Sequence, residues 1–238
     1  MKQKSLVNQN PYGKEFLDTF EILANKYGKF KVWNDFIFLS ACCISNVSDP
    51  RLQRYNYVVD QYNTEECTIF FYMIKYVFYS LRKNPRQLFL KDMFEALGLN
   101  NKGRYKPDTL YNIDFYNAAY ELQHEMEKAG EDIIFLCVQD KDPMIAQMHY
   151  IQLSALGLQA IVKIGDPLSD PYVPEDFFDD KVWVTPKFAL NFSSYNKLHS
   201  DEFLNNQNTE TISVKNKQAL PKKQTEQRKN NRISKEKK

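Results

Sequence analysis

The chain has 238 residues, of which 43% are hydrophobic and 26% charged, so it can bury one good-sized core or two small ones. No run of about 18 uncharged apolar residues occurs and the first residues are polar, which fits neither a membrane span nor a secretory signal. The net charge of +2 is uneven: residues 205–238 hold ten Lys or Arg and three Glu, so they carry +7 and residues 1–204 carry −5. We therefore expect a cytoplasmic protein with no membrane partner.

The four cysteines, Cys42, Cys43, Cys67 and Cys137, form no Cys-x-x-Cys pair, and the three histidines do not cluster with them. This spacing predicts reduced, buried thiols in a cytosolic protein. It also predicts no metal site.

The first half of the chain has the periodicity of helices. Residues 1–12 are expected to be disordered, and apolar residues at three- and four-residue spacing then predict a helical domain over 13–105. The expected helices span residues 15–27, 32–45, 51–61, 64–83 and 87–97. Residues 64–83 have the clearest signals, with Thr64 and two acids at the start and Arg82 and Lys83 at the end.

The second half alternates between helix and strand. The apolar run 132–138 (DIIFLCV) predicts a strand buried on both faces. Helices are expected over 110–128 and 143–156, and further strands over 159–164 and 181–185. The fold class is therefore α/β, with an α/β domain over 106–200 and a disordered basic tail over 201–238.

One segment resembles a known family. Residues 138–157 (VQDKDPMIAQMHYIQLSALG) are similar to the second conserved block of adenine-N6 DNA methyltransferases, in the phage- and plasmid-borne form related to the type I restriction modification subunit. Residues 35–51 and 89–103 resemble the helical part of those enzymes, and 182–188 (VWVTPKF) resembles their Trp-x-Thr-Pro segment. The likeness covers about residues 30–190. It implies a helical region followed by a truncated Rossmann-like methyltransferase sheet.

Two loops that the reaction requires are missing from the sequence. The family holds S-adenosylmethionine against a Gly-rich turn, but no two of the seven glycines here lie within four residues of each other. The family holds the flipped adenine in an Asn/Asp/Ser-Pro-Pro-aromatic loop. The nearest text here, residues 169–172 (SDPY), has one proline, and its simpler interpretation is a turn. We therefore assign no catalytic residue.

Three carboxylates remain as candidate cofactor ligands. Asp140 ends the first strand of this block, where the family's acid binds the ribose of S-adenosylmethionine. Asp142 precedes Pro143, and for this residue a role as the cap of the following helix is favoured over a role as ligand. Asp166 resembles the acid of the third block, which faces the adenine ring, and is otherwise part of a turn. We expect no cofactor unless this site survives for S-adenosylmethionine.

Basic residues in two polar segments are candidates for contact with nucleic acid. The alternatives are an exposed polar loop and a solvated tail. The candidates are Lys102, Arg104, Tyr105 and Lys106 in the loop, and Lys222, Lys223, Arg228, Lys229 and Arg232 in the tail.

Three functions stay open. The first is a non-catalytic methyltransferase relative that binds DNA or a protein partner for a mobile element, in regulation or in interference with restriction–modification. The second is an active adenine-N6 DNA methyltransferase completed by another chain. The third is a small-ligand or protein-binding module with no link to DNA. The open edge of a short parallel sheet also predicts a homo-oligomer or a complex.

Overall fold

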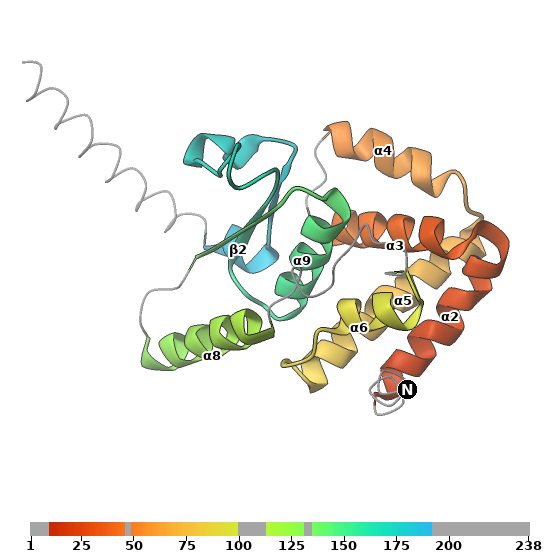
Figure 1. Ribbon diagram of the computed structural model, residues 1–238, viewed down its shortest axis with the longest axis horizontal. Coiled ribbons are helices and arrows are strands. Elements are labelled where there is room, and N and C mark those ends of the chain that lie inside the picture. The colour runs from red at the N-terminus through yellow and green to blue at the C-terminus, as the bar shows by residue number, and fades with distance from the viewer. Residues whose placement is uncertain (1–9, 46–48, 100–112, 131–134, 192–238) are drawn as a thin grey trace, which may run out of the picture. The chain divides into compact units, whose positions relative to one another are not determined.

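The computed structural model describes residues 10–45, 49–99, 113–130 and 135–191, which lie within one unit spanning Met1–Asn191. In that part of the chain, helices precede a small sheet (Figure 1). The helices before the sheet are α2 (Pro11–Tyr27), α3 (Lys29–Ile44), α4 (Asp49–Val59), α5 (Thr64–Lys83), α6 (Phe89–Ala96) and α8 (Ile113–Ala129). The remaining elements are β1 (Leu136–Asp140), α9 (Pro143–Ala155), β2 (Ala160–Ile164), the 3-10 helix η1 (Pro174–Phe178), β3 (Val182–Val184) and α10 (Pro186–Leu190).

Helix α5 has the bounds that its terminal residues predict. The Asn63 side chain accepts a hydrogen bond from the Glu66 backbone N–H at 2.9 Å, and the Glu66 carboxylate accepts one from the Asn63 N–H at 2.9 Å. This reciprocal pair satisfies two N–H groups that have no partner inside the helix. Lys26 Nζ, 2.7 Å from Glu66, ties the same end to α2.

Helix α3 lies at the centre of the helical part. It packs on α2, α4, α5 and α9. Its Trp33 ring contacts the rings of Phe16, Phe20 and Phe94, at centroid distances between 5.5 and 6.2 Å. Each aromatic residue buries a large apolar area, so this cluster is a major source of stability for the helices.

Helix α9 joins the helices to the sheet. All of its residues from Met144 to Leu153 are buried, including the polar Gln147, His149 and Gln152, because other elements pack on more than one side of the helix. It packs on α3 and α5 as well as on β1 and β2 (Figure 1). The helices and the sheet consequently share one hydrophobic core.

The sheet is mixed and small, with the strand order β1-β2-β3. Strands β1 and β2 are parallel and pair Gln139 with Lys163, whereas β2 and β3 are antiparallel and pair Val162 with Trp183. The described residues are therefore mostly helical, with a helical amino-terminal region followed by a small mixed sheet of three strands.

Two expectations about burial are wrong. Strand β1 was expected to be buried on both faces, but Cys137 is exposed and the rest of the strand is half-buried. The reason is that β1 is an edge strand, with β2 on one side and no other strand of the described residues beside it. All four cysteines were expected to be buried; Cys42 is, but Cys43 and Cys137 are exposed and Cys67 is half-buried. Because α3 is nearly all apolar, its sequence does not show which face of the helix meets water, and Cys43 lies on that face.

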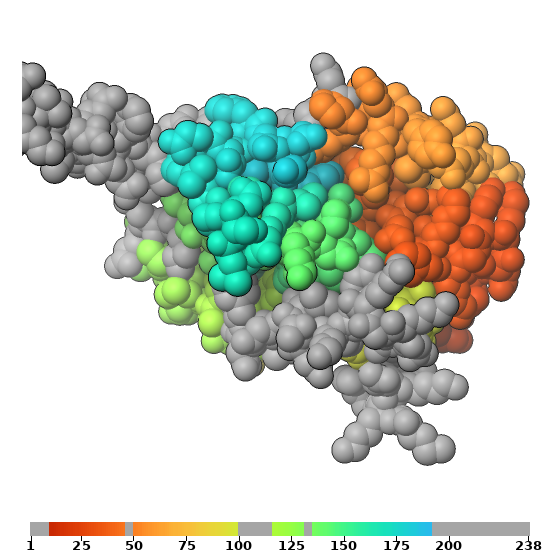
Figure 2. Space-filling view, turned by 45° about the horizontal axis from the view of Figure 1, so that its top comes forward, coloured from red at the N-terminus to blue at the C-terminus, as the bar shows by residue number. Residues whose placement is uncertain are grey.

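Arg51 joins α4 to the end of the sheet. Its guanidinium lies 4.0 Å from the centre of the Trp183 ring, and its Nε donates to the Asp180 carbonyl at 2.9 Å. Its Nη2 also donates to the Val182 carbonyl. Figure 2 shows α4 and the segment before β3 on the same face of the molecule. No helix in the described ranges is long and apolar enough to cross a membrane.

Candidate functional site

The three candidate carboxylates lie at the carboxyl ends of β1 and β2. Because these strands are parallel, they end at the same edge of the sheet, where the Gly165 N–H donates to the Asp140 carbonyl at 2.9 Å. Asp142 begins α9 just after β1, and Asp166 follows Gly165. The fold thus brings Asp140 and Asp166 to neighbouring strand ends, at the edge where doubly wound proteins bind ligands.

Each of these carboxylates accepts hydrogen bonds from its own loop. Asp140 Oδ1 accepts from the Asp142 N–H at 2.7 Å. Asp142 Oδ1 accepts from the N–H groups of Met144 and Ile145, at 2.9 and 3.3 Å, so this residue is the amino-terminal cap of α9. Asp166 Oδ1 accepts from the Leu168 N–H at 3.0 Å, which closes a turn.

Burial raises the pKa of Asp140, and the neighbouring Asp142 carboxylate raises it further. The hydrogen bond from the Asp142 N–H acts in the opposite direction. A half-buried carboxylate of this kind is costly to keep ionised. Among the three candidates, Asp140 therefore has the environment most typical of a functional group.

Residues 165–181, which we call the edge loop, are fastened over this edge by two adjacent side chains. The Lys163 side chain is 2% exposed, and its ammonium lies 2.7 Å from Asp170 Oδ1 and 2.8 Å from Asp176 Oδ2. The paired Gln139 donates to the Asp170 carbonyl at 2.5 Å and accepts from the Tyr172 N–H at 3.1 Å. The fastening therefore holds the residues 169–172 (SDPY) against the strand ends.

Sequence reasoning missed this fastening. Hydrogen bonds to Asp170 and Asp176 raise the pKa of Lys163, and the same ammonium lowers the pKa of Asp176. A lysine within an apolar strand, followed by several acids, was the one available signal. Gly165 completes the arrangement, because a Cβ atom there would lie 2.9 Å from Asp170 Oδ2 and 3.1 Å from Gln139 Nε2.

The Trp-x-Thr-Pro segment has a structural role in this fold. Trp183 supports Arg51. The Thr185 hydroxyl donates to the Leu158 carbonyl at 2.8 Å and accepts from the Ala160 N–H at 2.9 Å, so it fastens the end of β3 to the start of β2.

The candidate nucleic-acid contacts cannot be placed. The loop residues Lys102, Arg104, Tyr105 and Lys106 lie outside the described residues, as do Lys222, Lys223, Arg228, Lys229 and Arg232. Within the described part of the chain, no group of three or more His, Cys, Asp or Glu is arranged to hold a metal ion.

No protein-family model, curated protein or solved structure matches this chain.

Proposed function

We propose that this chain is a non-catalytic relative of the adenine-N6 DNA methyltransferases with a truncated Rossmann-like sheet. In this proposal it is a binding factor of a mobile element. It regulates or interferes with restriction–modification through contacts with DNA or with a protein subunit.

The proposal is supported most directly by the groups at the carboxyl ends of β1 and β2, which are already engaged within the chain itself. Asp142 is used as a helix cap, and Asp140 and Asp166 each accept an N–H of their own turn. Lys163 and Gln139 hold the edge loop against the strand ends. An active enzyme would need its base-binding loop at this place, to receive the flipped adenine. The edge thus holds its own loop in place, and the chain contains no Pro-Pro-aromatic loop that would hold the amine of a flipped adenine.

A second function is favoured by strand β1. It has a free edge among the described residues, and Asp140 stands at its end with a raised pKa. A partner chain that added a strand and a Gly-rich turn beside β1 would complete a cofactor site. In that case the protein is one subunit of an active methyltransferase that uses S-adenosylmethionine.

Calorimetric titration with S-adenosylmethionine and with S-adenosylhomocysteine, followed by methyl-transfer assays on DNA with candidate partners added, separates these two functions. We expect no binding up to millimolar concentration, for the full chain and for Asp140→Asn alike. Micromolar binding that Asp140→Asn abolishes would show that the cofactor site survives. Methyl transfer to DNA in the presence of a candidate partner would then overturn the non-catalytic proposal.

The salt dependence of DNA binding tests the form of the proposal in which DNA is the target. The full chain is compared with a variant in which Lys222, Lys223, Arg228, Lys229 and Arg232 are all changed to Gln. The slope of log K against log salt should become shallower by about 0.9 for each phosphate contact removed. The control changes Lys29 and Lys128, which pair with Glu21 and Glu125, to Gln and should leave the slope unchanged. An equal slope of log K against log salt in all three proteins would show that these tail residues make no phosphate contacts.

The same comparison applies to the loop. Changing Lys102, Arg104 and Lys106 to Gln tests its phosphate contacts, and Tyr105→Ala tests stacking on a base. If the full chain binds no DNA at low salt, the proposal keeps only its protein-binding form.

A further inference from the structure

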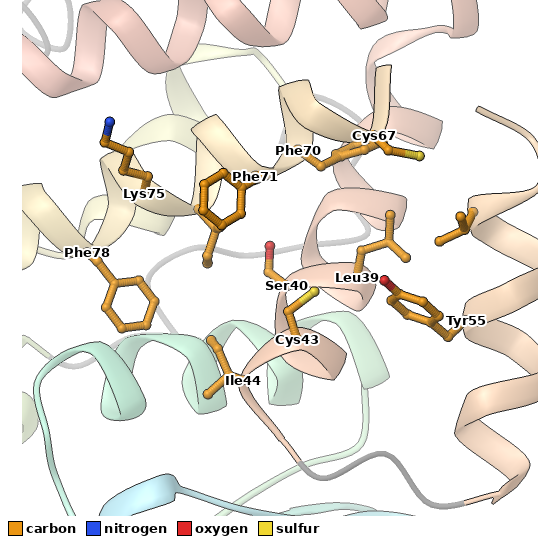
Figure 3. Close-up of a pocket in the computed structure, with 12 residues that line it drawn as sticks. Leu39, Ser40, Cys43, Ile44, Tyr55, Cys67, Phe70, Phe71, Lys75 and Phe78 are labelled. Carbon is orange, nitrogen blue, oxygen red and sulfur yellow. The ribbon is translucent and has the colours of Figure 1, made fainter. Parts of the chain in front are cut away.

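An open groove lies between three helices of the amino-terminal region, and no residue of the sheet lines it. It has a volume of ≈ 480 Å³. Helix α3 forms its floor, and α4 and α5, which both pack on α3, form its walls (Figure 3). Ser40 and Cys43 on the floor point into the groove, and Tyr55 faces it from α4.

The α5 wall is a stripe of apolar side chains at helical spacing. Cys67, Phe70, Ile74 and Phe78 recur every three or four residues, so they lie on one face of α5. The stripe runs from Cys67 to Phe78, which is about 16 Å along the axis at the rise of an α-helix. A helix face of this kind is normally buried against another element. Here Phe70 is buried, Cys67, Ile74 and Phe78 are half-buried, and Phe71 on the same wall is 66% exposed.

The apolar surface continues beyond the groove itself. Phe71 contacts Tyr72, with ring centroids 6.4 Å apart. The Lys75 ammonium lies 5.8 Å from the centre of the Tyr72 ring and 5.4 Å from that of Tyr79. Tyr72 and Tyr79 are both exposed. A continuous surface rich in Phe and Tyr is typical of the centre of a protein interface.

The groove has a positive charge at its rim. Lys75 is the one charged residue among those that line it. No carboxylate of the described residues forms an ion pair with Lys75. An occupant that places an acidic group beside this ammonium would gain a charge pair, whereas a basic occupant would meet repulsion.

We propose that this groove binds an amphipathic helix of a partner protein, with apolar side chains along one face and an acidic residue next to them. Two helical walls and a helical floor leave a space that a fourth helix fills by ordinary side-chain packing. The exposed rings outside the groove favour a helix over a small molecule, because a ligand of groove size leaves Tyr72 and Tyr79 uncovered. The inference does not depend on methyltransferase ancestry, and its test contains neither DNA nor S-adenosylmethionine.

The probes are two synthetic helical peptides of about 16 residues, long enough for about four turns. Both carry Leu at three- and four-residue spacing; one has Glu beside the Leu face and the other has Lys there. Binding to the full-length protein is measured by fluorescence anisotropy. We expect the acidic peptide to bind roughly fivefold more tightly, as for a partly exposed charge pair. The Lys75→Glu variant should reverse the order of the two peptides.

Two further variants test the place of binding. Phe71→Glu puts a charge on the wall, and Cys43→Trp fills the floor; each should weaken binding of the acidic peptide by roughly tenfold or more. The matched control is Ile22→Glu on α2, because Ile22 is 61% exposed and lies outside the groove. Circular dichroism confirms that each variant is folded.

Several results would overturn the proposal. One is the absence of binding by either peptide at millimolar concentration, and another is acidic-peptide binding that Phe71→Glu and Cys43→Trp leave unchanged. A dimer in sedimentation that Phe71→Glu dissociates would also overturn it, because the occupant would then be a second copy of this chain. Binding of dodecanoate in the groove, with neither peptide able to displace it, would assign the groove to a small amphiphile.

Discussion

Asp142 was a candidate both for a cofactor ligand and for the cap of α9, and the cap role makes a prediction about stability. As the cap of α9 it accepts from two backbone N–H groups, and Asp142→Ala removes that acceptor. We expect the free energy of unfolding to fall by about 1 kcal/mol, and Asp142→Asn to retain most of it because an amide oxygen accepts the same bonds. Urea denaturation measures both. The control, Asp166→Ala, affects one exposed turn and should cost less than about 0.5 kcal/mol. A neutral Asp142→Ala would show that α9 does not need its cap.

Asp140 should destabilise the fold at neutral pH. Its pKa is raised in the folded state by burial, so folding favours the protonated form. The stabilising contribution is present below the unfolded pKa, about 3.9, and is lost as pH rises through the folded value. Asp140→Asn removes the charge and keeps an acceptor for the Asp142 N–H. We expect the variant to be more stable at pH 7 and equal at the acid end of a pH series of urea denaturations. Lower stability at pH 7 would mean that the hydrogen bond outweighs burial.

At the scale of the elements, the fastening of the edge loop depends on Lys163. Lys163→Met keeps the volume of the side chain but leaves Asp170 and Asp176 without their cation. We expect a loss of about 2 kcal/mol, below the cost of breaking a fully buried pair because Asp170 is half exposed. Lys187→Met, which breaks the more exposed pair with Glu127, is the control and should cost less than about 1 kcal/mol. Equal losses in urea denaturation would contradict a special role for Lys163.

The pKa shifts of this ion pair add a pH signature to the comparison. The raised pKa of Lys163 gives stability that is complete below its unfolded value and is lost as pH rises through the folded one. The lowered pKa of Asp176 gives stability that is present above its unfolded value and is lost as pH falls through the folded one. The difference between the wild type and Lys163→Met should therefore shrink at both ends of the pH range.

The elements were predictable to different degrees, for physical reasons. Helix α5 has the predicted bounds because its capping and terminal charges are local in the sequence. Strand β1 was predicted over 132–138, of which 132–134 lie outside the described residues, and it is described over Leu136–Asp140. The strand continues past the predicted end because an apolar run does not show where pairing with β2 stops. The fastening by Lys163 and Gln139 was missed. Its hydrogen bonds join two strands to the edge loop, and the sequence does not show that this loop turns back over the strand ends.

At the scale of the whole molecule, sequence periodicity cannot reveal surfaces made by several elements. The apolar stripe on α5 is visible in the sequence, but an open groove requires that α4 and α5 pack on α3 with a space between them. The candidate carboxylates were predicted because they follow strands directly. Arg51 was not, because its partners Asp180 and Val182 lie more than a hundred residues away in the chain.

The helices and the sheet should unfold together, because α9 packs on both and Arg51 joins α4 to β3. The two tryptophans report on each part: Trp33 on α3 and Trp183 on β3. Trp183→Phe isolates the first signal and Trp33→Phe the second, and we expect the urea profile of each protein's fluorescence to coincide with that of its own circular dichroism.

Adding Arg51→Lys to each of these single-tryptophan proteins removes the forked contact with the two carbonyls, since an ammonium does not match it. We expect both fluorescence midpoints to move to lower urea concentration together. The corresponding loss in the free energy of unfolding should be about 1–2 kcal/mol. The control is Arg54→Lys, whose guanidinium lies on the Phe38 ring 4.2 Å from its centre and makes no described contact with the sheet. A shift of the Trp183 signal alone would mean that the sheet unfolds as a separate unit, and that the shared core does not couple the two parts.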